Sequence, residues 1–388
     1  MIKTLTAYTA EVDDVNDAVD EILEQLDIDT ALLKNSLGIV TCHLEFVEEG
    51  IFKALADALP FDVVGMTTLS SSVSKEFEMI SLSIMVLTSD DVVFKAGVSA
   101  PVSEDTEGVS RNVYQSVTAG EAPVMMLAFV PMNTKLSGDD FLQFMDEASG
   151  GVPVFGSAAI DFNHWIRSPR VLFNGENYTE NIVLMAMYGN VNASYSLTSI
   201  SEKNVLKQKA VITDSEKNIL KEVNGGNATE YLKGMGLIQD ENVRGGQLVG
   251  VGTIPFMVYP YEGAKPVARN VFGITENGSI ICGARMFKGA TLGIGSISLE
   301  DVIETAKKAV MDVVSGGAKG VLMFSCASRS VALDLDAGAE AAVVEDTVDG
   351  KIPYLFAYSG GEICPVPNEK GGLTNAYHNS TLAILSFT

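Results

Sequence analysis

The sequence predicts an α+β protein of two domains, with mixed, largely antiparallel sheets packed together and flanked by helices. Three observations lead to this class. A chain of 388 residues is longer than one hydrophobic core usually serves. Helical and strand-like patterns alternate at both ends of the chain, and the middle is dominated by strand-like runs. Both kinds of region in one chain favour sheets that carry helices on their outer side.

The first 150 residues alternate strands with helices. Apolar positions spaced as on one helical face separate the strand-like runs. The helices are expected after Asp13, Val47, Asp105 and Ser137. The strands are expected at residues 4–10, 37–46, 61–66, 79–87, 92–98 and 124–130.

The middle of the chain is predicted to be all-β. Residues 150–161 indicate a glycine-marked turn, and strand-like runs follow between residues 170 and 211. Residues 203–224 are rich in Lys, Glu and Asn, which is typical of a domain boundary. We therefore expect an N-terminal domain of residues 1–215 and a C-terminal domain of residues 216–388.

The second half begins with a short helix after Asn227 and three short strands. Ser298 and Asp301 cap a strongly amphipathic helix. An apolar strand from Gly320, a helix at residues 336–345 and a second apolar strand from Pro353 complete the pattern. No repeat of fixed period is visible in the sequence.

Charge and cysteine content exclude several classes of function. Lys and Arg number 26 against 50 Asp and Glu, so the net charge of -24 repels nucleic acid and anionic membrane surfaces. The N-terminus lacks a secretory signal and no apolar run has the length of a membrane span, so a cytoplasmic protein is expected. Four scattered cysteines, three histidines and the absence of a nucleotide-loop spacing favour free thiols, with no metal and no cofactor.

Polar side chains gather where the two C-terminal apolar strands end, and a third cluster follows them. Because an unpaired charge inside a fold costs several kcal/mol, such strand ends are expected to lie at an edge or a cleft. The candidate ligand-binding residues there are Ser325, Cys326, Arg329, Tyr358, Ser359, Glu362, His378 and Asn379.

Two readings of the charged residues in this group stay open. Arg329 has the planar fork that suits a ligand's carboxylate, and Glu362 could receive a ligand's ammonium group. Alternatively, Arg329 pairs with Glu340 or Glu362 and holds the fold together. A carboxylate of the protein would neutralise the charge of Arg329 as well as a ligand's carboxylate would.

Cys326 is a candidate nucleophile, with His378 as its base and Asn375 or Asn379 as an orienting group. A free cysteine is more often buried and inert, so we expect no catalytic residue and favour a binding protein over an enzyme.

Two strand ends in the first half also carry small polar residues, at positions 67–72 and 156–161. Their backbone N–H groups could hold an anion, or the segments could be tight turns. Thr67, Ser157 and Asp161 are the candidate ligand-binding residues in this half.

Several of these segments together resemble a known family. The runs GVLMFSCASR at 320–329, YSGGEI at 358–363 and HNST at 378–381, with Glu340 between them, are similar to the C-terminal signature of the FIST family, the "F-box and intracellular signal transduction" domain. GMTT at 65–68 and VFGSAAID at 154–161 resemble the N-terminal portion of that family. The resemblance covers nearly the whole chain.

The resemblance implies an intracellular sensory domain that binds a small polar metabolite, with amino acids or related compounds favoured. Two FIST-like halves fill the chain, so the protein is expected to act on a separate signalling protein. Two alternatives stay open: a hydrolase or transferase that uses Cys326, and a protein-interaction scaffold without a ligand.

Overall fold

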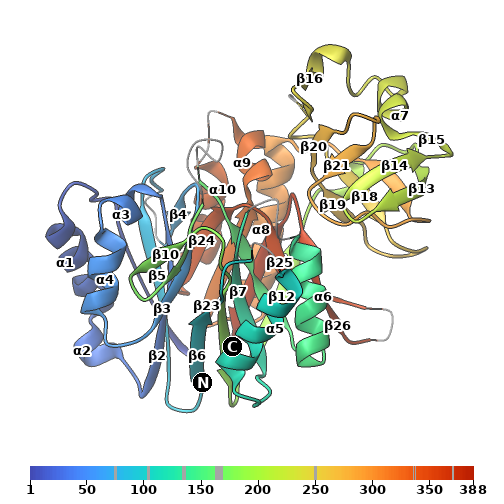
Figure 1. The fold of residues 1–388 in the computed structure, drawn as a ribbon. Coiled ribbons are helices and arrows are strands. Elements are labelled where there is room, and N and C mark those ends of the chain that lie inside the picture. Colours follow the sequence, from blue (N-terminus) through green and yellow to red (C-terminus); the bar gives the residue numbers. More distant parts are fainter. Residues whose placement is uncertain are drawn as a thin grey trace.

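The computed structural model describes most of the chain, and the described residues form four β-sheets (Figure 1). Three sheets and their helices make up the body of the molecule, and the fourth belongs to a smaller domain. Both termini lie at the same end of the body. The described residues are 1–73, 77–102, 105–132, 137–161, 169–248, 251–334, 336, 338–368 and 371–388.

The three sheets of the body repeat one arrangement of four strands. In each, two central strands run parallel, a third lies antiparallel beside the first of them, and a fourth lies antiparallel beside the third. In space the first sheet has β1 (Lys3–Thr9), β5 (Leu82–Ser89), β2 (Asn35–Cys42) and β3 (Val63–Thr67); the second has β6 (Val93–Val98), β11 (Val183–Tyr188), β7 (Met125–Pro131) and β8 (Val154–Ala159); the third has β12 (Ala193–Thr198), β27 (Leu382–Phe387), β23 (Gly320–Cys326) and β24 (Tyr354–Ser359).

Each sheet with its helices forms one unit, and the units follow one another along the chain. One helix precedes the first central strand and another joins the two central strands. The repeat lies in the topology, which is why no fixed period appears in the sequence. The helices are α1 (Val15–Leu26) and α4 (Ile51–Ala58), then α5 (Thr106–Thr118) and α6 (Gly138–Ser149), then α8 (Leu299–Ser315) and α10 (Ala339–Val348), with short α2 (Ile28–Ala31), α3 (Glu45–Glu48) and α9 (Ala327–Leu333).

The units exchange strands in a ring. After the second central strand of each unit, the chain forms one or two further strands, which we call the excursion. The first strand of each excursion pairs with the second central strand of another unit. The excursions are β4 (Ser71–Ser72), which pairs with β24; β9 (Val171–Phe173) with β10 (Glu176–Tyr178), where β9 pairs with β3; and β25 (Glu362–Pro367) with β26 (Leu373–His378), where β25 pairs with β8. No unit therefore completes its sheet alone.

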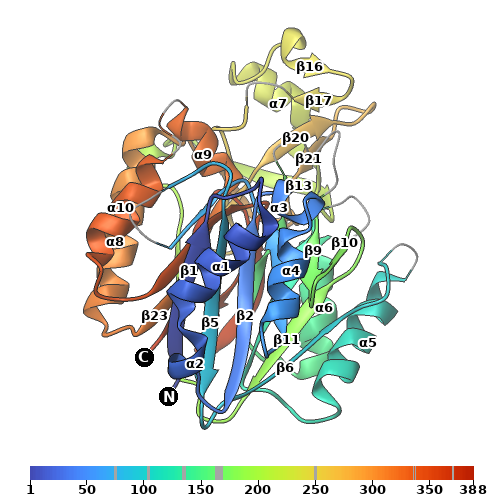
Figure 2. The same cartoon turned by 90° about the vertical axis from the view of Figure 1, so that its left-hand side faces the viewer.

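The core of the body lies where the inner faces of the three sheets meet. Met85, Leu127 and Phe324 represent the first, second and third sheets in this cluster. The outer face of each sheet is covered by its own helices, and Figure 2 shows α1 and α4 on the first sheet, with α8 and α10 to one side. The central strands are buried on both faces, so they read as continuous apolar runs.

A smaller domain is inserted into the third unit between β12 and α8. It projects from one end of the body (Figure 1) and has its own apolar cluster. We call it the inserted domain. It contains β13 (Ala210–Glu216), β14 (Ile219–Val223), β15 (Gly226–Asn227), α7 (Ala228–Gly234), β16 (Val243–Arg244), β17 (Gln247–Leu248), β18 (Phe256–Tyr259), β19 (Val267–Arg269), β20 (Val271–Ile274), β21 (Ile280–Cys282) and β22 (Thr291–Ile294), with 3-10 turns at Glu202–Asn204 and Asp240–Asn242.

The predicted α+β class with mixed sheets and outer helices is confirmed. Whether residues 1–215 and 216–388 fold as separate domains stays a prediction, but position 215 lies inside β13 and the strand pairing of the body crosses it. The expected turn at residues 150–161 contains β8 instead. The expected strand from Gly320 ends at Cys326, so Arg329 lies on helix α9.

Gly65 of β3 provides a test of how closely the central strands approach. It pairs with Val40 of β2, and a Cβ at position 65 would overlap the carbonyl group of Val40. We expect Gly65→Ala to lower the free energy of unfolding by about 1–3 kcal/mol or more, because the parallel pair must separate. Urea denaturation measures the change.

Gly234 of helix α7 is the matched control for this substitution. A Cβ there meets nothing within 4 Å, so Gly234→Ala is expected to leave stability unchanged or raise it by up to about 1 kcal/mol. Equal effects of the two substitutions would contradict the close approach of β2 and β3.

Candidate functional site

The polar strand ends of the third unit converge on one buried region. Cys326 and Ser359 end the neighbouring parallel strands β23 and β24, where they are register partners. Glu362 begins β25 and lies between Ser157 of β8 and His378 of β26. The structure therefore brings together residues from all three C-terminal clusters and one residue from the first half.

Hydrogen bonds connect further predicted residues at the strand ends. The N–H of Cys326 donates to the carbonyl oxygen of Thr381 at 2.9 Å, and Ser157 Oγ donates to the carbonyl of Gly361 at 2.6 Å. The N–H of Ile160, next to Asp161, donates to the carbonyl of Thr67 at 3.0 Å. Thr67 and Asp161 thus lie at neighbouring strand ends and are buried.

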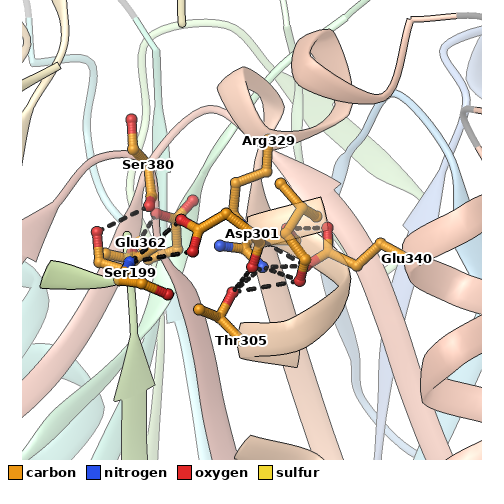
Figure 3. Close-up of polar contacts among 11 residues, drawn as sticks. Ser199, Asp301, Thr305, Arg329, Glu340, Glu362 and Ser380 are labelled. Carbon is orange, nitrogen blue, oxygen red and sulfur yellow. Dashed lines mark hydrogen bonds and ion pairs between the residues drawn. The ribbon is translucent and has the colours of Figure 1, made fainter. Parts of the chain in front are cut away.

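Arg329 forms a buried ion pair with Glu340. Its Nε and Nη2 donate to Glu340 Oε1 at 3.0 and 2.6 Å, and both side chains are at most 1% exposed (Figure 3). Nη2 also donates to the carbonyl of Val302 at 3.1 Å and to Thr305 Oγ1 at 3.2 Å. Ser325 Oγ donates to the other oxygen of Glu340 at 2.8 Å.

These contacts bear on the two readings of Arg329. Its guanidinium holds α9, α10 and α8 together, and its carboxylate partner is Glu340, not Glu362. A ligand would have to displace this ion pair to use Arg329. The geometry favours the structural reading.

Arg329→Met tests this reading. It would leave the Glu340 carboxylate buried without its cation, which costs about 3–5 kcal/mol of stability. Chemical denaturation measures the loss, and Arg329→Met/Glu340→Gln should recover part of it. A loss below about 1 kcal/mol would argue instead that Arg329 is held ready for a ligand.

Glu362 is a fully buried carboxyl group without a cationic partner among the described side chains. Ser359 Oγ donates to Oε1 at 3.3 Å and Thr381 Oγ1 donates to Oε2 at 2.6 Å. Burial raises the pKa of Glu362 from 4.5 to about 8, although the two hydroxyls and the charge of Arg329 act against this rise. At pH 7 Glu362 is therefore mostly in its neutral form, and it ionises as the pH rises through about 8.

His378 lies beside Glu362 on the same face of the β25–β26 pair, because cross-strand partners share a face. Its Nε2 lies 3.0 Å from the carbonyl oxygen of Cys364, so Nε2 carries the proton and donates it. Burial lowers the pKa of His378 to about 4. Nδ1 is then an acceptor, and no described residue donates to it.

The inserted domain covers this region. Asn270 follows β19, and its Oδ1 accepts from Ser380 Oγ at 2.5 Å while its N–H donates to Asn379 Oδ1 at 3.3 Å. A Cβ on Gly283 would overlap the side chain of Asn379, so the two parts of the chain approach closely there. The region lies at the interface between the body and the inserted domain.

Cys326 is surrounded by groups that favour its thiol form. It is buried, and its Sγ accepts from Ser328 Oγ at 3.3 Å and lies 3.9 Å from Asn270 Nδ2. Burial and the neighbouring charge of Glu362 raise the pKa of Cys326 to about 12. Within the described residues, no hydrogen bond joins it to His378, so the nucleophile hypothesis gains no support from the geometry.

Sequence reasoning missed several residues of this region. Ser380 and Thr381 belong to a segment that the sequence did single out, whereas nothing in the sequence links Asn270 to the C-terminal strands. Ser380 has a left-handed backbone (φ of 55°), which is uncommon for a residue other than glycine and is found at functional sites.

The buried Glu362 predicts a specific pH dependence of stability. Between about pH 4.5 and 8 the folded protein holds a proton that the unfolded chain has released, so stability falls as pH rises. His378 has the opposite effect between about pH 4 and 6.5, where only the unfolded chain is protonated. Above pH 6.5 the contribution of Glu362 is unopposed by His378.

We therefore expect the free energy of unfolding to fall by up to about 2 kcal/mol between pH 6.5 and 8 in the wild type. In Glu362→Gln this fall should disappear, because glutamine does not titrate. Urea denaturation at several pH values measures the slope. The same slope in both proteins would show that Glu362 titrates near its ordinary value.

Membrane-spanning helices and metal clusters are both absent from the described part of the chain. None of its helices combines the length and the apolar character that crossing a membrane requires. Nor does it contain a group of three or more His, Cys, Asp or Glu side chains that could hold a metal ion.

Comparisons with known proteins identify the family. The model of the FIST N domain matches residues 36–226 and that of the FIST C domain matches residues 229–365. The chain therefore belongs to the FIST family, whose domains are sensory domains of signal transduction.

Other comparisons add little. No curated protein matches the chain. The solved structures that match include cyanuric acid hydrolase from A. caulinodans, at 13% identity over 48% of this chain and 71% of that one, with a TM-score of 0.24. A likeness this distant carries no argument about function.

Proposed function

We propose that this FIST protein is a cytoplasmic sensor that binds a small polar ligand beside Glu362 and passes the signal to a separate protein. The expected ligand is an amino acid or a related small metabolite. The region around Glu362, His378 and Asn379 serves as the binding site, and the inserted domain serves as its cover.

One observation carries this proposal. The carboxyl group of Glu362 and Nδ1 of His378, which has no donor among the described residues, are two buried acceptors on the same face of one strand pair. Leaving Nδ1 buried without a donor costs about 1–3 kcal/mol. Glu362 accepts from two hydroxyls, but neither of them supplies a positive charge for its ionised form. A ligand with several N–H donors, such as an ammonium group, would satisfy both.

The location supports the same function. Ligand sites occur preferentially at domain interfaces, and the contacts of Asn270 with Asn379 and Ser380 form such an interface. Glu362 is fully buried, so a ligand would enter when the inserted domain moves away from the body. Movement of one domain against another is a common way to convert binding into a signal.

A thermal-shift screen with the twenty amino acids and their amine and amide derivatives tests the proposal. A ligand present at a hundred times its Kd adds about 2.7 kcal/mol to the free energy of unfolding. We expect at least one compound with an ammonium group to raise the melting temperature, and Glu362→Gln to lose this response.

Two variants serve as controls for the screen. Glu304→Gln removes an exposed carboxylate that pairs with Lys203 away from the site, and it should keep the response. Cys326→Ser should also keep it, since the proposal gives the thiol no chemical role. If no compound shifts the melting temperature, the sensor proposal fails and the ligand-free scaffold gains support. Turnover that disappears in Cys326→Ser would replace the sensor with an enzyme.

A further inference from the structure

We propose that Arg269 of the inserted domain binds a carboxylate of the ligand. This inference rests on the proposed function and extends it, because it assigns the anionic end of the ligand to the cover of the site. Glu362 and His378 in the body would bind the ammonium end. The ligand would then be a zwitterion whose two ends contact different parts of the chain.

The two most deeply buried arginines of the described chain differ in whether a carboxylate forms an ion pair with them. Arg329 is 1% exposed and forms an ion pair with Glu340 at 2.6 Å. Arg269 is 2% exposed, and no described carboxylate lies within ion-pair distance of it. A buried guanidinium without an anion is costly to keep, since burial disfavours its charged form.

The hydrogen bonds of Arg269 use Nε and Nη1 of its guanidinium group but not Nη2. Nε donates to the carbonyl of Arg285 at 3.0 Å, and Nη1 donates to the carbonyls of Ala268 at 3.0 Å and Tyr377 at 3.2 Å. Nη2 has no acceptor among the described residues. Carbonyl oxygens orient the guanidinium but do not neutralise it, so the group is positioned and still able to bind an oxyanion.

Arg269 adjoins the proposed site directly. Its Nη1 contacts the carbonyl of Tyr377, the residue before His378 on β26. The next residue along the chain, Asn270, contacts Asn379 and Ser380. The guanidinium of Arg269 therefore reaches the C-terminal end of β26 from the inserted domain. The acceptors of Glu362 and His378 lie at the same end of β26, on the side of the body.

Asp139 offers a purely structural explanation that must be separated from this one. It is the carboxylate with the strongest favourable effect on the charge of Arg269, yet its Oδ2 accepts from the N–H of Arg285 at 2.6 Å. If Asp139 alone balances Arg269, a ligand's carboxylate is unnecessary. Asp139→Asn should then weaken the protein without changing which ligands bind.

A comparison of each amino acid with its carboxamide tests the inference on the wild-type protein. The carboxamide keeps the ammonium group but lacks the carboxylate. For any amino acid that binds, we expect the acid to bind at least about tenfold more tightly than the amide, as measured by isothermal titration calorimetry. Equal binding of acid and amide would overturn the role of Arg269 and leave the proposed function standing.

The Arg269→Met variant locates the effect. It should bind the acid and the amide with affinities within about threefold of each other, whereas Arg269→Lys should keep part of the preference. Arg285→Met is the matched control, because Arg285 joins the same interface through Asp140 at 2.8 Å. It should keep the full preference, and its loss there would mean that a loosened interface, not Arg269, explains the result.

The outcomes separate the two proposals. If no amino acid, amine or amide binds, the proposed function fails and this inference fails with it. If amines and amides bind as well as acids, only the inference fails. Should Arg269→Met not fold, the comparison of acid with amide on the wild type, together with Arg269→Lys, still decides the matter.

Discussion

The shared core between three sheets is the constraint on which the rest of the structure depends. Every central strand has an inner face that meets the other two sheets and an outer face under helices, so its length must be apolar. Most polar side chains of these strands therefore lie near the strand ends. Because the second central strands pair with excursions from other units, several of these ends come together, and the candidate site forms there.

Four buried ionisable side chains near the strand ends have different kinds of partner. Arg329 and Glu340 neutralise each other's charge in an ion pair that contacts three helices. Glu362 and Arg269 instead have hydroxyl and carbonyl groups as their hydrogen-bond partners in the described chain, and the guanidinium of Arg269 also lies over the ring of Phe287, 5.9 Å from its centre. An arginine in a structural ion pair and one proposed to bind a ligand can look alike in a sequence, and their partners in the fold distinguish them.

The sequence indicated much of the fold and part of the candidate site. Apolar periodicity located most helices and strands, and the polar strand ends located Glu362 and His378. It did not show β8, because Gly156, Ser157 and two alanines look like a turn unless the strand is covered on both faces. It also could not place Asn270 and Arg269, whose importance comes from contacts with residues more than a hundred positions away.

The ring of exchanged strands also determines which part of the molecule is free to move. Each unit of the body holds a strand of another, so one unit cannot open without breaking the sheets of the others, and the body should unfold as a single cooperative block. Among the described residues, the inserted domain shares no sheet with the body, and the chain passes between the two parts before β13 and after β22. We therefore expect a domain movement short of unfolding to hinge at these two connecting segments.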